Sequence, residues 1–246
     1  MKTSHFALSI ILAACSVPAF GQFGSLKNKI PYPRPSGADA LTRSGDFVLY
    51  LTIATDQGMR ALDELAAAFP PEKVAAFQKL SAQYKEASKN RPNGNIDAES
   101  FTVASDAAEE MAKLENDWQT YRKEGAKSVR KAHARIGLML IADGEASTRA
   151  PQLLRDLQGE ARSISVKSYD SNKANRISNM VTFLKCVIDQ APRQTRSFTT
   201  VRRIAKNIAD AEHYQLAEDP PADSVTTTAQ MNVAVAKIDA DNMGEN

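Results

Sequence analysis

The side chains that most often carry catalysis and metal binding are scarce in this chain. It has three histidines in 246 residues, and one of them, His5, lies in a segment that we expect to be removed. A di-iron site of the ferritin type needs two Glu-x-x-His turns, but Arg130 and Asp210 stand three residues before His133 and His213. No Cys-x-x-Cys, His-Glu-x-x-His or haem-attachment sequence is present, and no glycine-rich phosphate loop precedes a helix. The sequence therefore predicts no metal site and no cofactor.

Nucleophiles and carboxylates do not indicate an enzyme either. No Gly-x-Ser-x-Gly sequence exposes a serine on a sharp turn. Cys186 stands between Leu184 and Val187, which favours a small buried thiol. Four acids that could form pairs for acid and base chemistry occupy polar positions of an amphipathic pattern, which favours a solvated helix face. These acids are Asp106, Glu109, Glu110 and Glu115. A non-catalytic protein is the expectation that follows.

Charge is the feature that stands out. The totals are nearly balanced, with 31 basic and 29 acidic side chains, which argues against broad nucleic-acid binding. Along the chain, however, an acidic block at 97–117 precedes a basic block at 122–135, and a second basic block at 193–209 precedes an acidic one at 210–246. The residues that could form a basic interaction surface are Lys127, Arg130, Lys131, Arg135, Arg196, Arg202 and Arg203.

These blocks have two interpretations. Antiparallel helices could pair their acidic and basic faces within the bundle, or copies of the chain could pair them between molecules. Alternatively, the basic residues could form a surface that binds anionic lipid head groups, cell-wall polymer or an acidic protein.

Two aromatic side chains suggest a second kind of site. Trp118 and Tyr121 are three residues apart and share one face of an expected helix. They could line an apolar ligand pocket between helices, and the alternative is that they pack in the core.

The N-terminal segment reads as an export signal. Residues 1–21 combine Lys2, an apolar stretch at 6–14 and small residues that suit cleavage before Gln22. A Leu-Ala-Ala-Cys sequence ending at Cys15 also resembles a bacterial lipobox, whose cysteine is acylated and becomes the new N-terminus. Both forms place the protein outside the cytoplasm, either soluble in the periplasm or medium, or anchored by lipid. The cleavage site before Gln22 is complete, and a lipoprotein acylated at Cys15 would not need it, so the sequence favours the soluble form.

The expected elements behind the signal are an extended segment and a helical body. Residues 22–43 carry prolines on alternate positions and predict a tether, or a strap packed along the body. Residues 44–240 show apolar spacing of three and four and predict an all-α fold, a single bundle of about eight helices, before an acidic tail at 241–246. The expected helices span roughly 44–69, 70–90, 97–142 with a kink near Gly125, 149–165, 172–190, 195–216 and a short last segment.

These patterns favour one function and leave two alternatives. The leading hypothesis is an exported, non-catalytic binding or scaffold protein at the bacterial cell envelope. A carrier of an apolar small ligand between helices is the first alternative, and an enzyme of unfamiliar type is the second. Oligomers are compatible with the charge blocks.

Overall fold

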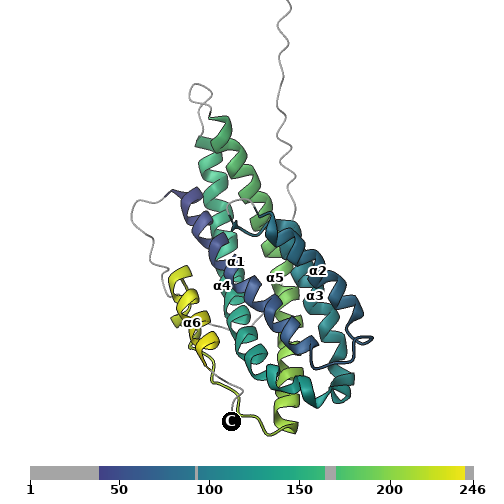
Figure 1. The fold of residues 1–246 in the computed structure, drawn as a ribbon. Helices are drawn as coiled ribbons and strands as arrows, with labels where there is room; N and C mark the ends of the chain where they lie inside the picture. Colours follow the sequence, from purple (N-terminus) through teal and green to yellow (C-terminus); the bar gives the residue numbers. More distant parts are fainter. Residues whose placement is uncertain (1–38, 92–93, 164–169, 242–246) are drawn as a thin grey trace, which may run out of the picture. The chain divides into compact units, whose positions relative to one another are not determined.

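The computed structural model describes residues 39–91, 94–163 and 170–241 (Figure 1). Six α-helices and three short 3₁₀ helices form this part of the chain, and it contains no strand. The α-helices are α1 (Ala40–Ala66), α2 (Ala75–Lys89), α3 (Ala98–Ala112), α4 (Val129–Ser163), α5 (Ser171–Ala211) and α6 (Thr228–Ala240). The 3₁₀ helices are η2 (Lys113–Thr120), η3 (Lys123–Ser128) and η5 (Ala222–Ser224). The predicted all-α bundle is confirmed.

Several predicted features lie outside the described residues. They are the export signal at 1–21 with Cys15, the Pro-rich segment up to residue 38, and the tail from residue 242. Among the helices that the structure describes, none combines the length and the hydropathy that crossing a membrane requires.

Short polar side chains fix where helices begin. The Asp39 carboxylate accepts a hydrogen bond from the backbone N of Thr42 at 2.7 Å, before α1. Asp97 does the same for α3, and accepts from the backbone N of Ser100 at 2.7 Å. Thr227 and Gln230 form a reciprocal capping box at the start of α6. Each cap satisfies a backbone donor that the first helical turn leaves unpaired.

The long helices α1, α4 and α5 pack side by side (Figure 1). Helix α4 runs antiparallel to α1 and also to α5. Arg43 near the start of α1 pairs with Asp156 late in α4, at 3.0 Å. Lys173 at the start of α5 pairs with Glu160 at the end of α4, at 2.5 Å. Helix α3 packs on α5, α2 packs on α3, and α6 packs on α1 and α4.

Large apolar side chains fill the space between these helices. Completely buried examples are Phe47, Leu51, Phe101, Ile136 and Phe198. Burying one such side chain stabilises the fold by about 1.5–3 kcal/mol. Alanines of α4 and α5 are also buried among these side chains.

Two predicted breaks are wrong, and they account for the excess in the expected helix count. Helix α4 continues through Gly144 to Ser163, and α5 continues through Pro192 to Ala211. Proline inside a helix costs about 3 kcal/mol and glycine about 1 kcal/mol. Buried residues continue on the inner face past both positions, so packing against neighbouring helices outweighs these local costs.

The stretch from 97 to 142 is broken more extensively than the predicted kink. The chain leaves the α-helical conformation after Ala112 and regains it at Val129, with η2 and η3 between. Here the chain contacts the end of α1: the backbone N of Arg122 donates to the carbonyl of Ala68 at 2.6 Å. Gly125 packs directly on the backbone of Ala67 and Ala68, where a Cβ would collide with it. This contact with α1 replaces a continuous helix.

Candidate functional site

The seven predicted basic residues do not form one uniform surface. Lys127, Arg196 and Arg203 are exposed, whereas Arg130, Lys131 and Arg202 are half-buried. Arg135 is completely buried and therefore does not belong to a solvent-exposed surface.

Arg135 is buried because side chains from two other helices surround its guanidinium. Its Nε donates to both carboxylate oxygens of Glu64 on α1, at 3.1 and 3.2 Å. Its Nη1 donates to the side-chain oxygen of Gln57, also on α1. Its Nη2 donates to Asp239 on α6, at 2.5 Å. One arginine of α4 thus links α1 to the C-terminal helix.

Asp239 is the point where several positive charges converge. Arg60 on α1 reaches its carboxylate at 3.3 Å, on the same side as Arg135. The hydrogen bond from Arg135 lowers the pKa of Asp239, and the charges of Arg135, Arg60 and Lys131 lower it further against the effect of partial burial. The pKa of Glu64 shifts the other way, because burial outweighs its attraction to Arg135. We call Arg60, Lys131, Arg135 and the Glu64 between them the basic socket.

A second acid of the C-terminal segment is held by α4 and α5. Arg202 Nη2 pairs with Asp219 at 2.5 Å, and Arg202 Nε donates to His133 Nε2 at 3.1 Å. Burial, followed by the charge of Arg202, lowers the pKa of His133 to about 4. The imidazole is therefore neutral at pH 7, with its proton on Nδ1. Arg130 Nε also donates to the backbone carbonyl of Gln215, at 2.9 Å.

The other acidic and basic blocks meet between α3 and α5. Arg193 pairs with Asp106 at 2.8 Å and also with Glu109. Arg203 pairs with Glu115 at the end of the same interface. Many charges of the acidic and basic blocks are therefore paired within the bundle. This agrees with the interpretation that helices pair their acidic and basic faces.

Trp118 and Tyr121 lie on the short η2 segment and beside it, not in a cavity between long helices. Their rings stack with centroids 6.4 Å apart and planes 9° apart. Both are half-buried against the core, and the Tyr121 hydroxyl donates to Glu212.

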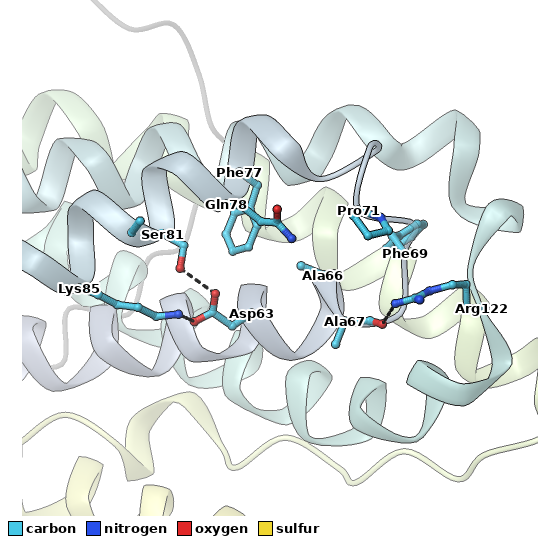
Figure 2. A pocket seen from close by; sticks show the side chains of 11 residues that line it. Asp63, Ala66, Ala67, Phe69, Pro71, Phe77, Gln78, Ser81, Lys85 and Arg122 are labelled. Atoms are coloured by element: carbon cyan, nitrogen blue, oxygen red, sulfur yellow. Dashed lines mark hydrogen bonds and ion pairs between the residues drawn. The ribbon is translucent and has the colours of Figure 1, made fainter.

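A groove of about 380 Å³ lies between α1 and α2, and neither Trp118 nor Tyr121 lines it (Figure 2). Its apolar walls include Phe69 and Phe77. Its polar side chains are mostly paired with one another: Asp63 accepts from Ser81 at 2.7 Å and from Lys85 at 2.8 Å. Arg122 donates to the carbonyl of Ala67 at 3.1 Å, at the other end of the groove.

The sequence did not single out a polar layer in the core of α4 and α5. Gly58 of α1 faces Met139 and Phe198, because a Cβ there would lie 3.1 Å from the Met139 side chain and 2.9 Å from the Phe198 ring. One turn further along α4 is Asp143, and one turn back along α5 is Gln194. Because α4 and α5 are antiparallel, the two side chains occupy the same layer.

Both side chains of this layer are completely buried, and none of their polar atoms has a partner among the described residues. Burial raises the pKa of Asp143 well above its usual value. The Thr195 hydroxyl acts in the opposite direction, but it donates its hydrogen bond to the carbonyl of Ala191, at 2.8 Å. The layer therefore favours a protonated Asp143 and lowers the stability of the bundle.

Cys186 is half-buried, not enclosed as expected. Its Sγ donates to the carbonyl of Ala98 at 3.4 Å and lies 3.5 Å from the Thr102 hydroxyl. Burial raises the pKa of its thiol, which disfavours the reactive thiolate. Within residues 39–91, 94–163 and 170–241, no three His, Cys, Asp or Glu side chains are grouped so that they could hold a metal ion.

Comparisons with known proteins add no assignment. No protein family model matches the chain, and neither does any curated protein or solved structure.

Proposed function

We propose that this chain is an exported, non-catalytic binding or scaffold protein of the bacterial cell envelope, and that an acidic partner binds at the basic socket, which Asp239 of α6 occupies in this structure. The pairing of both Arg60 and Arg135 with the single carboxylate of Asp239, on which the charge of Lys131 also acts, supports this proposal. Without Asp239, these three cations would face only the neighbouring Glu64, and the excess of positive charge is one that an acidic group of a partner neutralises. Charge complementarity of this kind steers association and selects partners.

The proposal is tested by crosslinking in living cells. With a photoreactive benzoylphenylalanine at position 131, irradiation is expected to join the protein to an acidic envelope component and produce an adduct of higher mass. The matched control carries the same group in place of the exposed Arg196 on α5, a helix whose main contacts are with α3 and α4. Equal adducts from both positions, or none from position 131, would contradict a specific contact at the socket.

The place of the protein follows from its N-terminal signal. We expect the mature chain to begin at Gln22 and to be recovered in the soluble periplasmic or secreted fraction. Mass spectrometry of the N-terminal peptide checks this directly. A peptide that begins at an acylated Cys15 would instead establish a lipid anchor, whose burial stabilises membrane attachment by about 0.8 kcal/mol per methylene. The protein would then stay with membranes in high salt, because salt weakens only electrostatic contacts.

Carriage of an apolar small ligand is the second candidate function, and the groove between α1 and α2 favours it (Figure 2). Its volume of about 380 Å³ and its Phe69 and Phe77 walls suit a compact apolar molecule. The pairing of Asp63 with Ser81 and Lys85 leaves few polar groups to orient one.

A further inference from the structure

Helix α6 is attached to the bundle by few apolar contacts. Among its 13 residues only Met231 and Ile238 are buried, and Ala234 and Val235 are half-buried against the core. Val233 in the middle of the helix is 72% exposed. Helices α1 and α5 each bury many more side chains than α6 does. The apolar contacts of α6 are therefore a small part of the hydrophobic core.

Helix α6 follows a connection that contains no long helix. Helix α5 ends at Ala211, and the residues between it and α6 are largely non-helical, with η5 as their single short turn of regular structure. Side chains of the bundle hold this connection: Tyr50 Oη donates to the carbonyl of Val225 at 2.9 Å, Arg149 Nη1 donates to the carbonyl of Thr226 at 2.9 Å, and Arg202 pairs with Asp219. Release of α6 therefore requires no long helix to break.

Arg135 pairs with one acid that belongs to the bundle and with one that belongs to α6. Glu64 belongs to α1 and stays beside Arg135 when α6 leaves. Asp239 belongs to α6, is 41% exposed at its side chain, and leaves with the helix. The vacated surface then holds Arg60, Lys131 and Arg135 against Glu64 alone. A buried arginine without any partner would be strongly unfavourable, and Glu64 prevents that state.

From these three observations we infer that α6 is a displaceable occupant of the basic socket and imitates the partner that binds there. This inference rests on the proposed function and specifies both the partner's chemistry and its regulation. The partner is an amphipathic helix with two aliphatic side chains seven residues apart and a carboxylate directly after the second. Met231, Ile238 and Asp239 display this pattern in α6. Seven residues make two helical turns, so both aliphatic side chains lie on one face.

Displacement predicts how affinity depends on the attachment of α6. A partner helix binds only molecules whose socket is open, so its apparent affinity is reduced by the open fraction. Weakening the attachment of α6 raises the open fraction and tightens binding in trans. Weakening it through an apolar anchor leaves every charge of the socket in place.

The experiment measures binding of a fluorescent synthetic peptide with the sequence of residues 226–241 to the full-length mature chain. The Met231→Ala chain is expected to bind this peptide at least about tenfold more tightly than the wild type. The Val233→Ala chain, altered on the exposed face of the same helix, is the matched control and should match the wild type. A peptide carrying Asp239→Asn should bind the Met231→Ala chain about tenfold more weakly, because the socket loses its carboxylate.

Equal peptide affinities for the Met231→Ala and wild-type chains would overturn the inference. Hydrogen exchange of the unaltered protein gives a second test that requires no substitution. Amides of α6 should exchange together and well before those of α4, and exchange of both only on global unfolding would show that α6 is not displaceable. Both tests use purified protein, so they can succeed when crosslinking from position 131 in cells fails, and the two proposals are distinguishable.

Discussion

Replacing Arg135 with alanine is expected to lower the free energy of unfolding by about 3–5 kcal/mol. The guanidinium is completely buried and binds Glu64, Gln57 and Asp239. Its removal leaves Glu64 as a largely buried carboxylate whose remaining ion pair among the described residues is with Arg60, with the Nε 3.6 Å away. Burying a charge without its partner costs far more than the intact pair contributes. Urea denaturation of the purified protein, followed by circular dichroism, measures the change.

The matched control is Arg60→Ala, which alters an arginine that contacts the same two acids. Its side chain is 53% exposed, so its pairs are screened by water and their loss should cost less than about 1 kcal/mol. A similar cost for Arg60→Ala and Arg135→Ala would show that burial of Arg135 is not the cause.

Replacing Asp143 with asparagine is expected to stabilise the protein at pH 8 by about 1–3 kcal/mol. Asparagine has nearly the same shape as aspartate, and it is neutral at every pH, so it can be buried in this layer without first binding a proton. The aspartate has no partner among the described residues, and burial raises its pKa. Thermal or urea unfolding of the two proteins at matched pH gives the difference.

The gain from Asp143→Asn should grow with pH. The folded state keeps a proton on Asp143 that the unfolded state has already released above a pKa of about 3.9. The stabilising contribution is complete below that value and is lost as the pH rises through the raised folded pKa, at about 1.4 kcal/mol per pH unit. His133 acts in the opposite sense: because its folded pKa is lowered to about 4, stability falls as the pH drops from about 6.5 to about 4, where only the unfolded imidazole takes up a proton. The variant must therefore be compared with the wild type at each pH.

Asp189→Asn on the exposed face of α5 serves as the control and should change stability by less than about 0.5 kcal/mol. A stability difference between Asp143→Asn and wild type that is the same at pH 5 and pH 8 would contradict a raised pKa.

Apolar periodicity was sufficient to predict the helical class and most helical residues. It located the inner faces because one face of each long helix is continuously apolar. It failed at Gly144 and Pro192, where local residues favour a break and tertiary packing continues the helix. It also failed at 113–128, where the end of α1 makes contacts that no local pattern encodes.

The site was less predictable than the fold. Arg135 and Asp143 both occur on the face of α4 that carries Ala132, Ile136 and Met139, so the periodicity contained a signal that these two polar groups are buried. The sequence indicated that acidic and basic blocks could pair. It could not show that Asp239 meets Arg135 across 104 residues, because that contact depends on the path of the chain after α5.

Gly125 limits what evolution can change at the end of α1. A Cβ at this position would lie 2.6 Å from the Cα of Ala68 and closer still to the carbonyl of Ala67. Both are backbone atoms, so no choice of rotamer relieves the collision. Divergent descendants that keep this fold must therefore retain glycine here, even after most of their surface has drifted. A glycine that closely follows an arginine in the segment between α3 and α4 is thus a fingerprint for recognising distant homologues.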